Sequence, residues 1–487
     1  MSTVSTRIGF IPSYRGGYGP IPSWCIKMRE QSLAALAKVE GLEVIVPQPP
    51  PAGSSGLDPV HGYCPHGAVH TLDEAEVVAE YFQREKVDGI IICALNFGDE
   101  RSACKVAEKL RVPTLLYATK EPPAMDDPSL ARVSDSYCGT LSIASGLYRR
   151  KLPFHYAGIF FPEEPEFLAD IATFVRAVAV VKALRNARIG QVGVRPETFE
   201  TVGYDESAVI RKFGQNIIYK ELSDIVLQAQ AIPDDDPTVR ALVQDFSSSV
   251  AEVTVADDWL LKDAKLELAL VDFWNRNGLS AMAIQCWPAI QQLWGMSVCA
   301  LLGRMTQRGM LTACEVDVLG ALAMLASYHA ALGHMLPHFV DWTIQHRENP
   351  NWLLAWHCGN APISLANDVR QTALRSRFDM TGKLPVKDGD RMAALYQFQL
   401  RPGPVTFCRL AEYDDEWKML IATGEIVPSN EVLAGTWSWV AVPDHTRLYR
   451  TLVEEGFIHH ASMIHGDQTA ALSLACKFLD IRPIVVS

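Results

Sequence analysis

Short, almost continuously apolar segments alternate with segments of helical periodicity through the first third of the chain. The apolar segments are 7–13, 42–47, 88–95 and 112–118. Apolar residues at helical spacing connect them at 24–39 and 71–85. A strand without polar alternation is buried on both faces, and a helix between two such strands is the connection that a parallel pair needs. This pattern predicts a parallel α/β domain over residues 1–170.

A second alternation of the same kind predicts another doubly wound parallel-sheet domain over 171–352. Its expected helices are 174–184 and 320–332, and its expected strands are 188–194 and 281–286. The remaining residues, 353–487, are predicted to form a β-rich, barrel-like domain, because short β-branched or aromatic segments there are separated by turn residues. Its expected strands are 404–409, 417–423, 424–428, 436–442 and 483–487, with a helix at 472–479.

Composition excludes several classes of protein. The chain has 487 residues, with 44 Lys and Arg against 56 Asp and Glu, and a formal net charge of −12. An acidic chain without clustered basic residues is a poor match for nucleic acid. No apolar run approaches the roughly 20 residues that span a bilayer, and no apolar signal segment follows Met1. The eleven cysteines are scattered without a CxxC pair, so we expect free thiols in a reducing cytoplasm.

Two groups of residues contain residue types that are common in binding sites, but their spacing or surrounding sequence does not match a cofactor or metal motif. Gly16-Gly17-x-Gly19 follows a strand, yet it is not the dinucleotide fingerprint, so we expect neither nicotinamide nor flavin. In that loop, Arg15 is either a solvated charge or a substrate contact. A second group lies in a Pro/Gly-rich loop, where metal binding is less expected than a structural role; its members are His61, Cys64, His66 and His70.

A further pair, His334 and His338, is four residues apart. Pro337 lies between them and interrupts a helix, so the two imidazoles are not expected to share a helix face. We favour a structural role for both.

Carboxylates and imidazoles repeatedly end buried segments in the second half of the chain. Glu315 and Asp317 interrupt the apolar run 312–322, and Asp341 follows Phe339-Val340. Two histidine positions behave in the same way, His357 after LLAW and His459-His460 after GFI. Individually, each is more often a hydrogen-bonded core group. Together they predict a mixed oxygen and nitrogen site suited to Mn²⁺ or another divalent cation, with the neighbouring Cys314 and Cys358 as core packing.

At these residues the sequence resembles the L-fucose/L-arabinose isomerase superfamily, specifically its fucose-isomerase-like branch. Five motifs from about residue 280 onward carry the resemblance, in matching order and with similar spacing. They are AIQCWP (283–288), ACEVD (313–317), HFVDW (338–342), WHCGNAP (356–362) and IHHAS (458–462).

The resemblance implies roles for individual residues. Glu315 and Asp341 would be metal ligands and the proton carriers of catalysis, and His460 would be a third ligand. His357 would be either a fourth ligand or a substrate contact. The residues implied to bind substrate are Trp287, Gln285, Asn360, His459 and, from a neighbouring subunit, Arg15.

The reaction implied is aldose–ketose isomerisation of a free sugar through an enediol, without a redox cofactor. A metal-mediated hydride shift is the competing route. The resemblance also implies a homo-oligomer, a trimer or hexamer, with its sites at subunit interfaces. Substrates in the family include L-fucose, D-arabinose and hexoses modified at C6, such as sulfoquinovose.

An anionic C6 group would need a basic partner, and Arg15, Arg101 and Arg195 are loop candidates for it. The alternative function is a non-catalytic sugar-binding or sensory protein, because two doubly wound lobes also describe periplasmic binding proteins. The acidic and histidine residues and the third, β-rich domain favour the isomerase.

Overall fold

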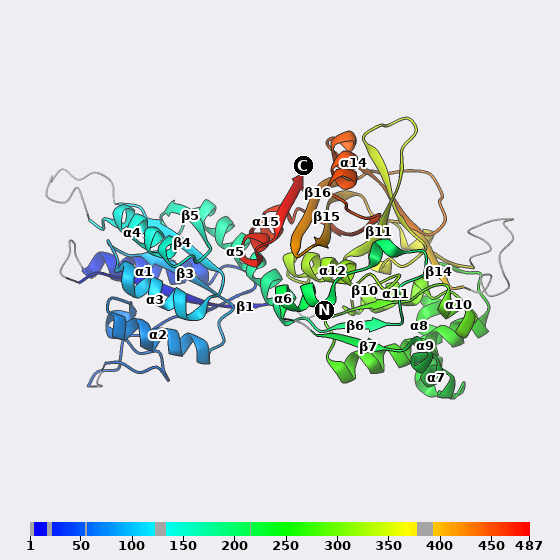
Figure 1. The fold of residues 1–487 in the computed structure, drawn as a ribbon, viewed down its shortest axis with the longest axis horizontal. Coiled ribbons are helices and arrows are strands. Elements are labelled where there is room, and N and C mark those ends of the chain that lie inside the picture. Colours follow the sequence, from blue (N-terminus) through cyan, green and yellow to red (C-terminus); the bar gives the residue numbers. More distant parts are fainter. Residues whose placement is uncertain (1–3, 17–21, 54–55, 122–132, 215, 377–392) are drawn as a thin grey trace. The chain divides into compact units, whose positions relative to one another are not determined.

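The computed structural model describes residues 4–16, 22–53, 56–121, 133–214, 216–376 and 393–487 (Figure 1). The chain divides into two compact units, Thr3–Lys182 and Ala183–Ser487, here called the N-terminal and C-terminal units. Among the described residues, no helix has both the length and the apolar character needed to cross a membrane.

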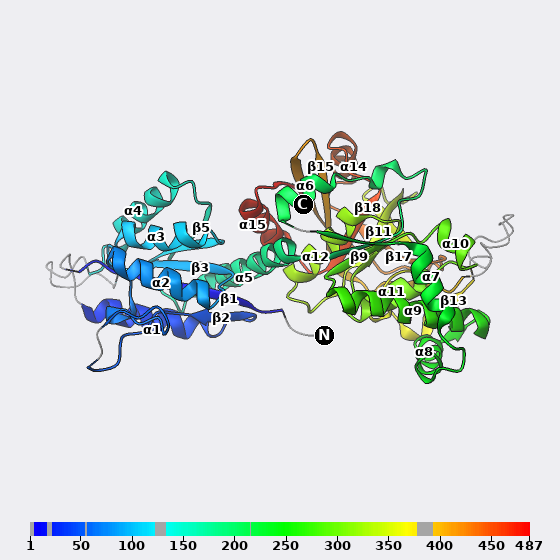
Figure 2. The same ribbon diagram turned by 60° about the horizontal axis from the view of Figure 1, so that its bottom comes forward.

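The N-terminal unit contains a parallel sheet with the strand order β2-β1-β3-β4-β5. Its strands are β1 (Thr6–Ser13), β2 (Leu42–Ile45), β3 (Gly89–Ala94), β4 (Thr114–Thr119) and β5 (Phe154–Phe160). Its helices are α1 (Pro22–Leu36), α2 (Leu72–Arg84), α3 (Glu100–Leu110) and α4 (Ser136–Arg149). Helices α2, α3 and α4 pack side by side on one face, and α1 covers the other (Figure 2). The predicted doubly wound architecture of this region is confirmed.

The C-terminal unit begins with a second parallel sheet, of order β10-β9-β6-β7. Its strands are β6 (Ile189–Val192), β7 (Ile217–Lys220), β9 (Ala281–Ile284) and β10 (Thr312–Ala313). Its helices are α6 (Glu206–Phe213), α7 (Leu222–Ala231), α8 (Pro237–Ser248), α9 (Asp257–Asn277), α10 (Ala289–Leu293), α11 (Cys299–Gln307) and α12 (Val318–Ala330); α5 (Pro165–Asn186) contains the boundary between the units. Strands β6 and β9 are buried along their whole length, as the parallel arrangement requires, whereas the edge strand β7 is partly exposed.

A large mixed sheet forms the rest of the C-terminal unit. Six of its strands pair in the order β16-β15-β18-β11-β12-β17, and an additional pairing of β16 with β17 closes them into a ring. These strands are β11 (His338–Gln345), β12 (Trp352–His357), β15 (Gly403–Tyr413), β16 (Glu416–Ile426), β17 (Thr436–Ala441) and β18 (His460–His465). The sheet continues beyond the ring through β8 (Glu252–Val253), β13 (Ala373–Arg375), β14 (Leu395–Gln399) and β19 (Arg482–Val486), with α14 (His445–Glu454) and α15 (Thr469–Leu479) between strands. The predicted β-rich, barrel-like character is confirmed.

Helix α12 positions the two halves of this unit for the site. Almost every residue from Val318 to Ser327 is fully buried, and the helix packs against β9 and β10 on one side and β15 and β18 on the other (Figure 1). A helix that is apolar around its whole circumference must be covered on all sides. The carboxyl edge of the parallel sheet is therefore held next to the closed ring.

Two expectations for this region were wrong in detail. Segments 417–423 and 424–428 form a single strand, β16, because the hairpin with β15 pairs continuously from Tyr413↔Glu416 to Gly403↔Ile426. The barrel also includes β11, which begins at His338, where no strand was predicted. The division into domains at 170 and 352 stays a prediction.

A buried acid in α9 gives a test of the fold. Asp263 is fully buried, and neither of its carboxylate oxygens has a hydrogen-bond partner. Burial, and then the charge of Glu267, raise its pKa well above the usual value, although Arg304 opposes them. The folded state therefore keeps a proton that the unfolded state releases, and this group lowers stability as the pH rises above about 3.9, the pKa of an unperturbed Asp.

We predict that Asp263→Asn raises the apparent melting temperature relative to wild type, and that the gain grows between pH 5 and pH 8. Each pH unit over which only the unfolded state ionises Asp263 corresponds to about 1.4 kcal/mol in the free energy of unfolding, which sets the scale of the gain. Melting curves at several pH values measure it. Asp235→Asn, at an exposed loop position, is the control and should show no such pH dependence. A gain that is independent of pH would contradict an ionisation effect at Asp263.

Candidate metal centre

Four side chains meet where the end of the barrel lies against the carboxyl edge of the parallel sheet. Asp341 lies in β11 and is paired directly across the sheet with His460, the first residue of β18. His357 is the last residue of β12, the other neighbour of β11. Glu315 lies in the turn between β10 and α12. Three adjacent barrel strands and one turn thus supply all four residues that the sequence predicted as metal ligands.

The distances place His460 at the centre of the group. Its Nε2 atom lies 2.8 Å from Glu315 Oε2 and 3.5 Å from Asp341 Oδ1. Within the described part of the chain, the groups of His, Cys, Asp or Glu able to share a metal ion are Glu315 with His459 and His460, and Asp341 with His357 and His460; within each group the ligand atoms lie within 4.8 Å of one another. Both groups belong to this one cluster.

The same four side chains each have a buried atom without a hydrogen-bond partner outside the cluster, where His460 Nε2 contacts Glu315 Oε2 and Asp341 Oδ1. These atoms are Glu315 Oε2, Asp341 Oδ1, His357 Nε2 and His460 Nε2. An unsatisfied buried polar atom costs about 1–3 kcal/mol, and native structures contain few of them. Four that converge on one point, two of carboxylate oxygen and two of imidazole nitrogen, make a donor set that fits a divalent cation.

The turn that carries Glu315 is locally strained. Glu315 and Val316 have φ angles of 61° and 59°, in the left-handed region that a β-branched residue such as Val rarely adopts. Such a conformation costs about 1–3 kcal/mol per residue and persists only where surrounding contacts fix it. Here Val316 N donates to Ile284 O of β9, and Trp287 Nε1 donates to Glu315 Oε1 at 2.8 Å. These contacts fix the direction of the carboxylate.

A buried ion pair supports His460 from behind. Asp317 Oδ2 lies 2.9 Å from His460 Nδ1, and Arg409 of β15 contacts both oxygens of the same carboxylate. Asp317 is fully buried and Arg409 almost so. A proton on Nδ1 that is donated to Asp317 leaves Nε2 as the lone-pair donor toward the cluster, which is the common arrangement behind a metal-bound histidine. Sequence reasoning noted Asp317 but gave it no role, and it missed Arg409.

The electrostatics of the cluster follow from these contacts. Burial favours the neutral acid of Glu315, but His460, His357 and Trp287 outweigh it and lower its pKa to about 2. Burial likewise opposes the charged form of His460, whereas Asp317 and Glu315 raise its pKa to about 9. Although burial also favours a neutral His357, Cys358, Asp341 and Glu315 raise its pKa to about 9. Glu315 is thus ionised at neutral pH, and a metal ion would displace protons from the imidazoles.

Aromatic rings line one side of the cluster. Phe199, in the loop after β6, lies edge-on to Trp287 with ring centroids 5.0 Å apart and edge-on to His459 at 5.3 Å. His459 in turn packs against His460 at 4.2 Å, and burial lowers its pKa. The structure therefore brings the predicted Trp287 and His459 to the ligand cluster. Phe199 was missed, because a single aromatic residue in a loop gives no signal in the sequence.

Other predicted substrate contacts lie nearby but have internal partners. Asn360 is buried, with its Oδ1 atom 3.2 Å from His338 Nε2 and its amide directed at Cys314 Sγ. Gln285, at the end of β9, accepts a hydrogen bond from Val194 N at 3.3 Å. Arg15 lies in the N-terminal unit, where it pairs with Glu100 and its guanidinium carbon lies 4.5 Å from the ring centroid of Phe97. Substrate contact by these three residues stays a prediction.

The weaker histidine groups have structural contacts. His338 is fully buried beside Asn360 and Thr436, and burial lowers its pKa to about 3. His61 pairs with Asp58 at 2.7 Å, and the thiol of Cys64 donates to Ala68 O. Most of the Gly16–Gly19 motif lies outside the described residues.

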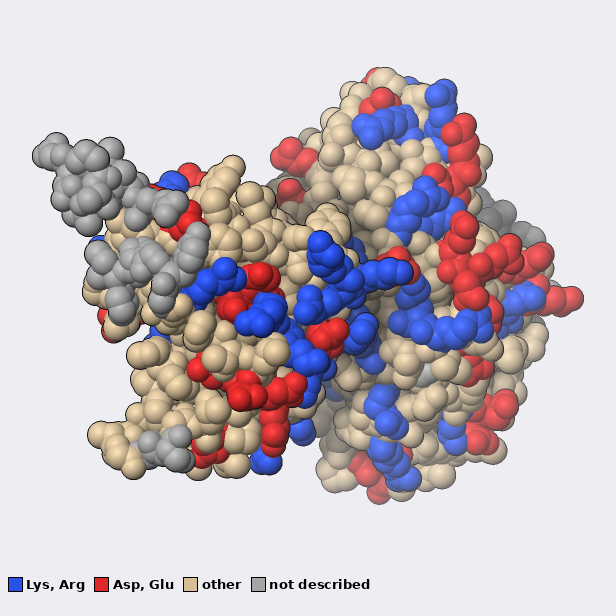
Figure 3. All heavy atoms as spheres, turned by 60° about the vertical axis from the view of Figure 1, so that its left-hand side comes forward, with Lys and Arg blue, Asp and Glu red and all other residues tan. Residues whose placement is uncertain are grey.

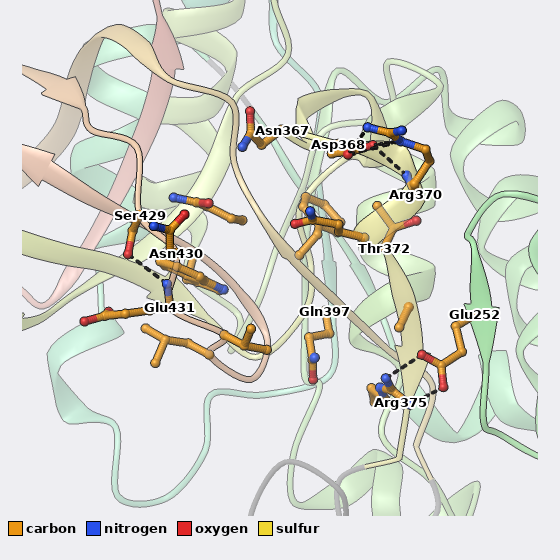
Figure 4. Close-up of a pocket in the computed structure, with 17 residues that line it drawn as sticks. Glu252, Asn367, Asp368, Arg370, Thr372, Arg375, Gln397, Ser429, Asn430 and Glu431 are labelled. Atoms are coloured by element: carbon orange, nitrogen blue, oxygen red, sulfur yellow. Dashed lines mark hydrogen bonds and ion pairs between the residues drawn. The ribbon is translucent and has the colours of Figure 1, made fainter.

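A separate polar cavity of about 490 Å³ lies beside β13 and β14 and contains none of the four ligand residues (Figure 4). Four of its charged side chains form two ion pairs, Arg375 with Glu252 and Arg370 with Asp368, and Glu431 accepts from Trp439 Nε1 at 2.6 Å. Figure 3 shows acidic and basic side chains intermixed over the face that it presents. Each charged side chain that lines the cavity therefore has a partner within the described residues.

Comparisons with known proteins agree with the site chemistry. Residues 59–185 match the family described as fucose/sulfoquinovose isomerase, N-terminal domain, and residues 355–486 match L-fucose isomerase, C-terminal domain. His357 and His460 fall within the second matched range, whereas Glu315 and Asp341 fall between the two.

Proteins that are similar to this chain over most of its length are named as isomerases. The sulfoquinovose isomerase of Alkalicoccus urumqiensis is 26% identical over 386 residues, which cover 78% of this chain and 82% of the relative. The sulfoquinovose isomerase of Clostridium sp. (strain MSTE9) is 26% identical, over 84% of this chain and 87% of the relative, and that of Priestia aryabhattai is 23% identical, over 86% and 90%. The chain therefore belongs to the fucose-isomerase-like family of aldose–ketose isomerases.

Proposed function

We propose that this sugar isomerase depends on a divalent cation held by Glu315, Asp341 and His460, with His357 as a fourth ligand. The observation that carries the proposal is the convergence of four buried donor atoms, one from each of these side chains, with no hydrogen-bond partner outside the cluster. Two carboxylates and two imidazoles without a thiolate suit Mn²⁺ or a similar ion of intermediate hardness. The alternative role of His357 as a substrate contact stays open.

The proposed mechanism assigns the proton transfer to the two carboxylates. When bound, the cation stabilises the negative charge that develops on the sugar oxygens. Asp341 and Glu315 carry the proton between C2 and C1, one as base and one as acid or a single group in both roles. Asp341 has the more accessible side chain, 23% exposed against 11% for Glu315, and the second oxygen of Glu315 accepts from Trp287. Asp341 is thus better placed to contact the substrate.

The residues around the carboxylates exclude water and hold their direction. The edge-on packing of Phe199 against Trp287 and His459 covers one side of the cluster with apolar surface. A low-dielectric wall strengthens every charge interaction within the site and protects a reactive enediol from side reactions. Trp287 additionally keeps Glu315 from rotating, because its indole donates to Oε1.

The proposed substrate is an aldohexose modified at C6 or a related aldose. The relatives named sulfoquinovose isomerase support a C6-modified hexose, and L-fucose and D-arabinose are the further candidates that the family resemblance suggests. A trimeric or hexameric assembly in which Arg15 reaches a neighbouring subunit's site remains part of this proposal.

We predict that EDTA removes isomerase activity and that Mn²⁺ restores it. Ketose formation from sulfoquinovose, L-fucose and D-arabinose, followed by chromatography before and after chelation, measures the effect. Mn²⁺ should also raise the melting temperature of the chelated protein, because a ligand that binds only the folded state stabilises it. Undiminished ketose formation after complete chelation, confirmed by elemental analysis, would contradict the proposed metal dependence.

We predict that Glu315→Gln lowers kcat by at least about 10³-fold and leaves the fold intact. The substitution keeps the shape of the side chain but removes a charged ligand and a proton carrier, and general acid–base catalysis alone accounts for about 10²–10⁴-fold. Steady-state kinetics with circular dichroism measure both effects. Glu425→Gln, at an exposed position of β16, is the matched control. A Glu315→Gln enzyme with wild-type turnover would refute the assignment.

We predict that Asp317→Asn weakens Mn²⁺ binding about 10–100-fold, as loss of the partner behind a ligating histidine commonly does. Isothermal titration calorimetry with Mn²⁺ measures the affinity without reference to activity. Asp317→Asn also leaves Arg409 buried without a full partner, so Arg409→Lys serves as the second variant, which retains the charge but loses the paired contacts. Unchanged Mn²⁺ affinity in both folded variants would show that the pair has only a structural role.

A further inference from the structure

The loop after β6 lies at the same sheet edge as the proposed metal centre. Strands β10, β9 and β6 are parallel neighbours, so the residues after Ala313, Ile284 and Val192 leave the sheet on one side. The first of these segments carries Glu315 and the second carries Trp287. Ligands of open parallel sheets bind outside the carboxyl ends of the strands, which makes the third segment, 193–199, a candidate for substrate contact.

Segment 193–199 is anchored to the site at both ends. At its start, Val194 N donates to Gln285 Oε1 at 3.3 Å, which ties the loop to the end of β9. At its end, Phe199 packs on Trp287 and lies 6.4 Å from the ring centroid of His460. The backbone between these two anchors is therefore held at the sheet edge that carries Glu315 and Trp287.

Arg195 lies between the anchors and has unused hydrogen-bonding capacity. Its side chain is exposed, and its Nη1 atom donates to the carbonyl oxygens of Pro196 at 3.5 Å and Glu197 at 3.2 Å. It forms no ion pair with a carboxylate of any described residue. A guanidinium has five N–H donors, so most of them remain available to a ligand.

The other arginines considered for an anionic group already have carboxylate partners. Arg15 pairs with Glu100, and Arg101 lies 3.5 Å from Asp99. Arg409, which lies behind the cluster, is buried and occupied by Asp317. Among these four side chains, Arg195 alone has no carboxylate ion pair within the described structure.

We propose that Arg195 determines specificity by binding an anionic group at C6 of the sugar, a sulfonate in particular. This inference rests on the proposed function, which places C1 and C2 at Asp341 and Glu315. The C6 substituent is at the opposite end of the sugar from the reacting carbons, and Arg195 lies in the same loop as Phe199, which packs against the cluster. A guanidinium binds a sulfonate through two parallel, charge-assisted hydrogen bonds, a geometry that an ammonium cannot reproduce.

The test compares two sugars that differ only in the charged group. Sulfoquinovose carries a sulfonate at C6, and 6-deoxyglucose carries hydrogen there. In Arg195→Gln with Mn²⁺, kcat/KM for sulfoquinovose should fall about 10–100-fold, mainly through KM, because a charge-assisted contact is lost. The value for 6-deoxyglucose should change by less than about two-fold. Arg195→Lys should recover part of the loss, and added salt should raise the wild-type KM for sulfoquinovose only.

Arg188→Gln is the matched control. Arg188 immediately precedes β6, at the opposite edge of the same sheet, and its side chain also donates to a backbone carbonyl, that of Asn277. The Arg188→Gln variant should keep the wild-type kcat/KM for both sugars. An equal loss for both sugars in Arg195→Gln, or no loss for sulfoquinovose, would overturn the proposal.

Failure of this inference is distinguishable from failure of the proposed function. Wild-type enzyme that converts 6-deoxyglucose or L-fucose but not sulfoquinovose would overturn the role of Arg195 and leave the isomerase standing. Wild-type enzyme that converts no aldose with Mn²⁺ would overturn the proposed function. In that case, calorimetric titration of sulfoquinovose into wild type and Arg195→Gln still decides the matter, since equal affinities would exclude Arg195 as the anion contact.

Discussion

The carboxylate of Asp317 connects the fold of the C-terminal unit to its chemistry. It accepts from Gly320 N at 2.8 Å and so caps α12, it pairs with Arg409 of β15, and it lies 2.9 Å from His460 Nδ1. A fully buried carboxylate is tolerated only when its hydrogen-bonding capacity is filled, because desolvation of a charge costs several kcal/mol. These three contacts, from α12, from Arg409 of the barrel and from His460, satisfy the hydrogen-bonding capacity of the carboxylate. The helix cannot shift against the barrel without disturbing the imidazole.

Next to Asp317, the cluster contains locally unfavourable features, namely strained backbone and buried polar atoms. The turn at Glu315 and Val316 has two consecutive non-glycine residues with positive φ, and four polar atoms nearby have no hydrogen-bond partner outside the cluster. The unit also has a large core of fully buried apolar side chains, whose packing can offset such local costs. Departures from local consistency that gather at one point are typical of a functional site.

The sequence was sufficient for the fold class and for the four side chains that meet in the cluster, but not for the contacts that support them. Alternation of apolar and helical segments predicts both parallel sheets, since it depends only on neighbouring residues. The four proposed ligands could be named because each follows an apolar segment within a recognisable motif. Arg409 and Phe199 could not be predicted, because Arg409 meets Asp317 across 92 residues of chain and Phe199 meets His460 across an even longer separation. Such pairings depend on barrel closure and loop conformation, which local patterns do not encode.

The cysteines near the cluster explain why the donor set contains no sulfur. Cys299 Sγ lies 3.1 Å from Cys358 Sγ, which also approaches His357 Nδ1 at 3.4 Å. The contact with Cys299, together with burial, raises the pKa of Cys358 well above that of an ordinary thiol, and a contact with Cys286 and burial do the same for Cys314. Cysteine binds metals as the thiolate, and a raised thiol pKa makes loss of that proton to a metal more costly. The four side chains that converge in the cluster thus offer oxygen and nitrogen, while these thiols lie beside them.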